Sequence, residues 1–307
     1  MSKKSAIIGL LLVLLLSACA AQTNLASSTS PDSKPRVLAS TSILADIAQN
    51  VAGDRLKVES LLPLGVDPHA YQPRPSDAAK VAESTVVILN GADYEQFLAP
   101  ILNHVGGRRQ VIEASAGLTP RAVPGDSASP GGDPHFWLDP NLVITYVKNI
   151  REGLMAADPA GAETYKANAD AYINQLEQLD TWIKTQVDTL TPEKRYLVTN
   201  HEVLGYFADR YGFTIVGSVI PSVSDEAAPS AQQMAALVDK IRSSNAMAIF
   251  LDATDNPSLA DQAAKEAKVK VITDLHLESL TPADGSAPTY IDIMKYNVDQ
   301  IVKGCQG

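Results

Sequence analysis

Three histidines of this chain stand in surroundings that suit metal binding. His69 and His135 each end an Asp-Pro-His tripeptide, and His201 follows a short apolar run, in a sequence with only five histidines. Proline fixes its own backbone angle and biases the residue before it toward extended backbone, so each tripeptide predicts a stiff, non-helical turn. Imidazole is the commonest protein ligand for zinc and suits several other divalent metals. We therefore expect the three rings to converge on one metal ion.

Each of these residues also has a simpler interpretation. His69 would be a solvent-exposed loop residue, and His135, which precedes a Phe-Trp pair, would be a core histidine whose ring bonds a carbonyl. Asp67 and Asp133 would either orient the rings by accepting a ring N–H or cap the turns. The sequence leaves these alternatives open.

The segment that begins at His201 resembles the zinc-protease motif HExxH but lacks its second histidine. Gly205 occupies the place of the second histidine, so the motif's pair of ligands is incomplete. We expect Glu202 to lie in the first turn of a helix, stabilised by the helix dipole. His104 is expected at a helix end on the surface. For a fourth ligand, the segment 274–278 offers three candidates: Asp274, His276 and Glu278.

The first residues predict export. Two lysines precede an apolar stretch at 6–16 that is shorter than the roughly 20 residues of a membrane span, and Leu-Ser-Ala-Cys ends at Cys19. This pattern predicts a lipoprotein signal peptide at 1–18 and a lipidated Cys19 anchored to the bacterial cell membrane, with an ordinary signal peptide as the alternative. A Ser/Thr/Pro-rich tether follows at 19–35. Cys305 then lacks a disulfide partner and is expected to be unreactive near a frayed terminus.

Length and charge limit the classes of function. A chain of 307 residues suggests two domains, expected at 36–140 and 193–307 with connecting helices at 141–192. The formal net charge of −10 argues against nucleic acid, which needs clustered Lys and Arg, and is compatible with attracting cations. Nothing in the sequence requires self-association, so we expect a monomer outside the cytoplasm.

Short apolar runs alternate with amphipathic stretches, which is typical of α/β proteins. We expect strands at 37–40, 56–62, 86–90, 111–113, 196–199, 214–218, 248–251 and 270–273. We expect helices at 43–51, from Ser76, and at 94–105, 203–211, 231–243, 258–267 and 290–302.

An apolar stripe with spacing of three or four residues predicts one helix over 160–190, roughly 45 Å long at 1.5 Å per residue. We interpret it as a rigid strut between two lobes, although a coiled-coil partner would also explain the stripe. The expected fold is two α/β lobes, each a mainly parallel sheet flanked by helices, with a ligand cleft between them. His201 would lie at the carboxyl end of a strand, where open α/β sheets bind ligands.

Several short segments together resemble the cluster A-I solute-binding lipoproteins of bacterial zinc and manganese ABC importers. They lie at 39–46, 67–69, 75–77, 135–140, 217–222 and 288–291. The resemblance implies one metal between two lobes, with His69, His135 and His201 as the first three ligands. The family's usual late aspartate before Ser-Leu is replaced here by Glu278. The short segment 121–132 lacks the His-rich loop of many zinc-specific relatives.

We therefore expect a non-enzymatic receptor that delivers a divalent transition metal to an ABC permease and its ATPase. Three imidazoles and one carboxylate favour Zn²⁺, and Mn²⁺ is the alternative cargo. Release would follow displacement of a second-lobe ligand when the permease docks, with little lobe movement. The rivals are a secreted metallohydrolase with Glu202 or Glu278 as base, and an adhesin or spacer lipoprotein with incidental histidines.

Overall fold

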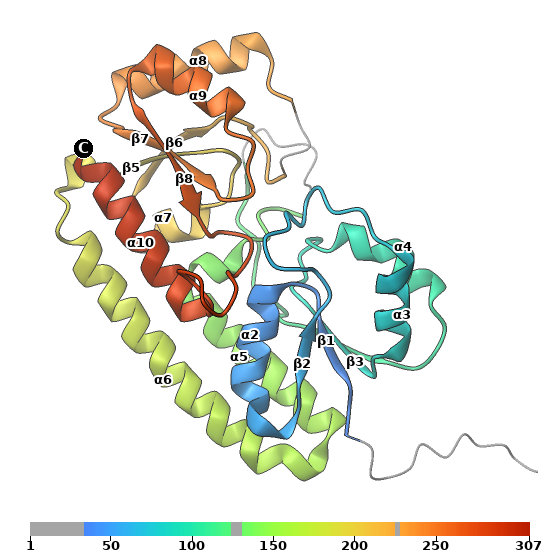
Figure 1. Ribbon diagram of the computed structural model, residues 1–307. Helices are drawn as coiled ribbons and strands as arrows, with labels where there is room; N and C mark the ends of the chain where they lie inside the picture. Colours follow the sequence, from blue (N-terminus) through green and yellow to red (C-terminus); the bar gives the residue numbers. More distant parts are fainter. Residues whose placement is uncertain (1–33, 124–130, 225–227) are drawn as a thin grey trace, which may run out of the picture. The chain divides into compact units, whose positions relative to one another are not determined.

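The computed structural model describes residues 34–123, 131–224 and 228–307 (Figure 1). Residues 35–307 form one compact unit. The predicted signal peptide at 1–18 and Cys19 lie outside the described residues. Within the described ranges, we find no helix whose length and apolar character would let it cross a bilayer.

Two four-stranded sheets carry the fold, and both are entirely parallel. The first has the order β2-β1-β3-β4 and the second the order β6-β5-β7-β8. Their strands are β1 (Val37–Ala39), β2 (Val58–Ser60), β3 (Val86–Leu89), β4 (Gln110–Glu113), β5 (Tyr196–Thr199), β6 (Thr214–Ser218), β7 (Ala248–Asp252) and β8 (Lys270–Leu275). The predicted two-lobed α/β fold is confirmed, although β2 is shorter than the expected run 56–62.

Helices connect the strands and cover the sheets (Figure 1). They are α2 (Ser42–Ala52), α3 (Pro75–Glu83), α4 (Ala99–His104), α5 (Pro140–Ala157), α6 (Ala162–Val187), α7 (Gly205–Tyr211), α8 (Ala231–Ser243), α9 (Ser258–Ala267) and α10 (Tyr290–Gln306). In each sheet the second strand along the chain lies on one side of the first strand, and the third strand lies on its other side. The strand order therefore reverses beside β1 and beside β5, and each reversal is a topological switch point.

Helix α6 is the long helix that the apolar stripe predicted. It has 26 residues, about 39 Å at 1.5 Å per residue, and so is slightly shorter than expected. The predicted stripe is buried: Tyr165, Ala169, Tyr172, Leu176, Leu179, Ile183 and Val187. These side chains pack on α5, α2 and α10, within one hydrophobic cluster that also includes residues of both sheets. The stripe is therefore satisfied inside this chain and needs no coiled-coil partner.

Two predicted helix starts were wrong. Helix α3 begins at Pro75 rather than being capped by Ser76, because proline fits the first helical position and Asp77 accepts the backbone N–H of Arg74. The expected helix 94–105 is reduced to a short 3-10 turn and α4. Pro100 lacks the N–H that a continuous helix through this segment would need.

Cys305 also differs from expectation. Helix α10 continues to Gln306, and the Cys305 thiol is buried and donates to the carbonyl of Tyr196. Burial raises the pKa of this thiol to about 12. The thiol is therefore packed against the core and not at a frayed terminus, and burial favours its less reactive protonated form.

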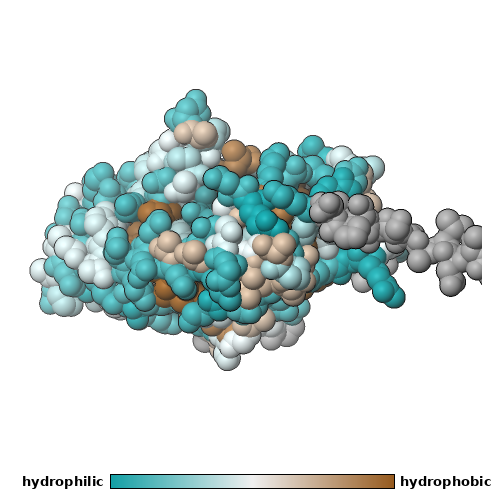
Figure 2. Space-filling model, turned by 90° about the horizontal axis from the view of Figure 1, so that it is seen from below, coloured by the Kyte–Doolittle hydropathy of each residue, from teal (hydrophilic) through white to brown (hydrophobic). Residues whose placement is uncertain are grey.

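The face drawn in Figure 2 is mostly hydrophilic, with apolar side chains in small separate patches. Among the described residues, the large apolar side chains that are exposed are Leu64, Val111, Met247 and Leu259. Scattered exposed apolar residues of this kind are normal for a soluble surface.

Candidate metal centre

Four residues predicted as ligands lie at the carboxyl ends of parallel strands. His69 is in the connection from β2 to α3, and His135 is in the long connection from β4 to α5. His201 lies two residues after β5, and Glu278 lies three residues after β8. In open α/β sheets this edge is where ligands bind, because the loops there converge at the switch points.

The three imidazoles surround one carboxylate oxygen. Glu278 Oε1 lies 3.2 Å from His135 Nε2, 3.6 Å from His201 Nε2 and 3.8 Å from His69 Nε2. The Nε2 atoms of His69 and His135 are 3.4 Å apart. One donor atom from each of the four residues lies within 4.8 Å of the other three, as neighbouring ligands of a single ion would.

The alternative fourth ligands point elsewhere. Asp274 accepts a hydrogen bond from Tyr296, and the ring of His276 contacts Ser286. His104 lies at the end of α4 on the surface, as expected, with Nδ1 against the carbonyl of Pro100. Of the three candidates in the segment 274–278, only Glu278 belongs to the cluster.

Glu202 is not in the first turn of a helix, which corrects our expectation. Helix α7 begins three residues later at Gly205, and the intervening residues form a turn in which the Glu202 N–H donates to the Ser222 carbonyl. Its carboxylate accepts a hydrogen bond from Ser218 at the end of β6. Glu202 therefore holds the His201 turn on its neighbouring strand.

Both Asp-Pro-His tripeptides form the same turn. In each, the aspartate Oδ1 accepts the backbone N–H of the histidine two residues later, at 2.7 Å for Asp67 and 2.9 Å for Asp133. Asp133 Oδ1 also lies 2.8 Å from His135 Nδ1. A carboxylate only accepts, so Nδ1 carries a proton, and Nε2 is the ring nitrogen that remains for a metal ion. Asp133 thus both caps the turn and orients the ring.

The aromatic residues after His135 bury this turn and fasten it to the Glu278 loop. His135 and Phe136 are buried, and the Phe136 ring stacks on Tyr206 with centroids 4.8 Å apart. Trp137 Nε1 donates to the carbonyl of Leu277 at 2.8 Å. The side chain next to one predicted ligand therefore holds the backbone next to another.

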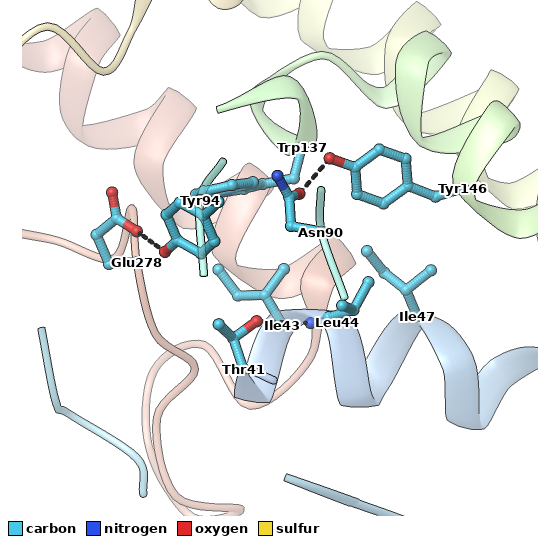
Figure 3. A pocket seen from close by; sticks show the side chains of 9 residues that line it. All are labelled: Thr41, Ile43, Leu44, Ile47, Asn90, Tyr94, Trp137, Tyr146 and Glu278. Carbon is cyan, nitrogen blue, oxygen red and sulfur yellow. Dashed lines mark hydrogen bonds between the residues drawn. The ribbon is translucent and has the colours of Figure 1, made fainter. Parts of the chain in front are cut away.

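Two further residues fix Glu278 and were not predicted. Tyr94 donates to Glu278 Oε2 at 2.6 Å (Figure 3). Oε1 is thereby left facing the imidazoles. Asp252, the last residue of β7, accepts the backbone N–H groups of Leu277 and Glu278. A carboxylate at the carboxyl end of a predicted strand could have indicated Asp252. No sequence signal singled out Tyr94.

The charges of the cluster favour an ionised carboxylate. Burial alone would raise the pKa of Glu278, but the neighbouring imidazoles, above all the charge of His135, outweigh burial and hold the pKa well below its ordinary value. Burial would lower the pKa of His135, yet Asp133 and Glu278 raise it overall. A bound cation can therefore take the place of the imidazole charge in neutralising the buried Glu278 carboxylate.

His69 is the ligand candidate closest to solvent. It lines an open groove together with Pro68, Asp93, Tyr94 and Ser222. Its side chain is 9% exposed, whereas His135, His201 and Glu278 are at most 2% exposed. A cation entering through this groove would meet His69 first.

The role of Asp133 can be tested by its replacement with asparagine. We expect Asp133→Asn to weaken binding of a divalent metal ion about 10- to 100-fold, because an amide accepts the Nδ1–H less strongly and no longer fixes the tautomer. Competition with a chromophoric chelator measures the affinity. Asp209→Asn, which removes a surface carboxylate paired with Arg121, serves as the control. A loss smaller than threefold would show that Asp133 does not orient the ring.

Two parallel sheets with a buried donor set at their facing loops define a class, the two-lobed solute-binding proteins. Residues 37–304 match the family described as "Zinc-uptake complex component A periplasmic". The chain belongs to this family. The resemblance drawn from short sequence segments is thereby confirmed.

Individual relatives differ in the metal for which they are named. The chain is 34% identical over 296 residues to the manganese-binding lipoprotein MntA of Halalkalibacterium halodurans, covering 96% of both chains. It is 32% identical to the iron-binding protein YfeA of Yersinia pestis, covering 94% of this chain and 92% of that protein. It also superposes on the Mn-bound periplasmic metal-binding protein of Candidatus Liberibacter asiaticus with a TM-score of 0.78, 30% identity, and coverage of 89% and 100%.

These comparisons confirm the prediction that the protein is not an enzyme. The matched family is a component of an uptake complex, and the relatives above are named for the metals that they bind. A secreted metallohydrolase with Glu202 or Glu278 as base is thereby excluded.

Proposed function

We propose that this protein is an extracytoplasmic receptor that binds one divalent transition metal through His69, His135, His201 and Glu278 and delivers it to an ABC permease with its ATPase. The observation that carries this proposal is the approach of three Nε2 atoms to one buried carboxylate oxygen. The same function is supported by relatives that are named as metal-binding or metal-transporter lipoproteins and that are similar to this chain over nearly their whole length.

Zinc is the cargo that the donor set favours. Three imidazole nitrogens and one carboxylate form a typical four-coordinate set for zinc, whereas manganese prefers more oxygen ligands. Tyr94 occupies Glu278 Oε2, which disfavours bidentate coordination by this carboxylate. Manganese is the alternative, because MntA is named for manganese and is similar along its whole length.

The proposal extends to location and organisation. Cys19 would carry a lipid that anchors the protein outside the cytoplasm, and the compact unit would act as a monomer. We propose lobes at 36–140 and 193–307, with 141–192 as the connection and α6 as its rigid strut. Release would follow displacement of Glu278 or His201 without wide opening of the lobes.

Calorimetric titration after chelator stripping tests the proposal. We expect Zn²⁺ to bind the purified protein at one ion per chain, and His201→Ala to abolish tight binding because it removes one of four ligands. His104→Ala, a surface histidine at the end of α4, is the control. Tighter binding of Mn²⁺ would keep the receptor and reverse the choice of metal. If neither ion binds, the proposed function is wrong.

A further inference from the structure

Two buried serines join the loop that carries Glu278 to the loop that carries His69. Ser279 follows Glu278 directly, and its Oγ accepts the backbone N–H of Gly65 at 2.8 Å. Ser42, in the first turn of α2, accepts the backbone N–H of Leu280 at 3.1 Å. The two hydroxyl oxygens are 3.3 Å apart. Each serine thus bonds the backbone of the opposite sheet's loops.

The position of this contact relates it to the metal centre. Gly65 lies four residues before His69 on the same β2–α3 connection, and Ser279 is adjacent to Glu278. The Glu278 loop passes the start of α2, where Thr41 caps the helix (Figure 3). Ser42 and Ser279 are both 6% exposed, so water competes little with these hydrogen bonds.

Other contacts of the Glu278 loop differ in what they join. Asp252 holds this loop to β7, within the second sheet. Trp137 and Tyr94 donate hydrogen bonds to this loop, and their rings also contact the His135 imidazole. The serine pair is set apart by joining the loop to the β2–α3 connection at Gly65, whose positive φ of 68° marks a tight turn. Leu64, beside this turn, is 46% exposed and is therefore accessible to a docking partner.

We propose that Ser42 and Ser279 form a latch that holds Glu278 over the three imidazoles and sets the rate at which the bound metal leaves. This inference rests on the proposed function. The serines are positioning residues, since their hydroxyl oxygens accept the backbone N–H groups of Gly65 and Leu280. Opening the latch releases the Glu278 loop from α2 and from the β2–α3 connection and leaves the hydrogen bonds of Tyr94 and Trp137 in place. The carboxylate then withdraws more easily while His69 and His135 stay in place, without separation of the lobes.

Stopped-flow release of Zn²⁺ into excess chelator tests the latch. We expect Ser279→Ala and Ser42→Ala each to speed dissociation about tenfold, because each removes a buried hydrogen bond. The association rate should stay within twofold, since the ligands and the groove are intact. The absorption spectrum of the Co²⁺-loaded variants should match that of the wild type, which reports an unchanged ligand set.

Three further measurements distinguish an effect of the latch from a general loss of stability. Ser286→Ala is the control, because this serine lies on the same segment but its hydroxyl contacts His276, outside the cluster. The metal-free variants should melt within about 2 °C of the wild type. The double variant should release metal no more than about twice as fast as the faster single variant, because either substitution already opens the latch.

Several results would contradict the proposed latch. Release within twofold of wild type in both single variants would overturn the latch, as would equal acceleration in Ser286→Ala or multiplicative acceleration in the double variant. An altered Co²⁺ spectrum would show that the serines shape the ligand set and do not gate it. If the wild type bound neither Zn²⁺ nor Mn²⁺, the proposed function would instead be rejected, and this is visible before any variant is measured.

Discussion

Glu278→Gln is expected to lower zinc affinity about a thousandfold. The carboxylate is the one anionic group of the cluster, and its Oε1 faces three imidazole nitrogens. Removing one partner of a buried charged group typically costs about 3–5 kcal/mol, and each 1.4 kcal/mol is a factor of ten in affinity. Glutamine keeps the shape and can still accept the hydrogen bond from Tyr94, so the loss reports charge and metal coordination.

A matched control for this substitution is Glu202→Gln. Glu202 lies next to His201 but bonds Ser218, outside the donor cluster. The zinc affinity of the Glu202→Gln variant should stay within about threefold of that of the wild type. Competition titration with a chelator of known affinity measures both variants, and circular dichroism verifies their fold. Near-normal affinity in Glu278→Gln would show that this carboxylate is not a ligand.

Removal of the metal is expected to lower the melting temperature by about 8–16 °C. A ligand present at a thousand times its dissociation constant stabilises the native state by about 4 kcal/mol, provided that the unfolded chain does not bind it. In a protein of this size, each kcal/mol corresponds to about 2–4 °C. Differential scanning calorimetry with Zn²⁺ and with excess chelator measures this shift.

The same calorimetric scan should contain one transition. The largest hydrophobic cluster takes residues from both sheets and from α2, α5, α6 and α10, so neither sheet has this core to itself. Glu278→Gln should show little shift on adding Zn²⁺, which separates binding at the site from general effects of the ion. Two resolved transitions would contradict the shared core.

Regular elements with strong patterns could be predicted from the sequence. The stripe of α6 and the bounds of α8 and α9 follow from apolar spacing, because each helix buries one face against a continuous core. The convergence of three histidines was also predictable, since Asp-Pro-His restricts the backbone at two of them. The residues themselves offered Asp274, His276 and Glu278 as the fourth ligand, and the resemblance to a known family favoured Glu278.

The remaining features depend on contacts between distant residues. Tyr94 reaches Glu278 across 184 positions of sequence, and no local pattern marks such a pair. The start of α3 depended on Pro75 and Asp77, whose combined fit outweighs the capping preference of Ser76. The sequence predicts Glu202 in a helix because residues 200–204 contain no proline or glycine that would interrupt one before Gly205. In each case tertiary or turn contacts decided between locally similar choices.

The separation of the ligand candidates along the chain has a further consequence. His69 and His135 are 66 residues apart, and each of the four comes from a different connection between strands and helices. An unfolded chain would need to close several long loops to gather them, at a large cost in entropy. If these four residues hold the metal as proposed, high affinity requires that both sheets are assembled. A polypeptide exported unfolded would carry no metal out of the cytoplasm, and loading would begin only after folding on the far side of the membrane.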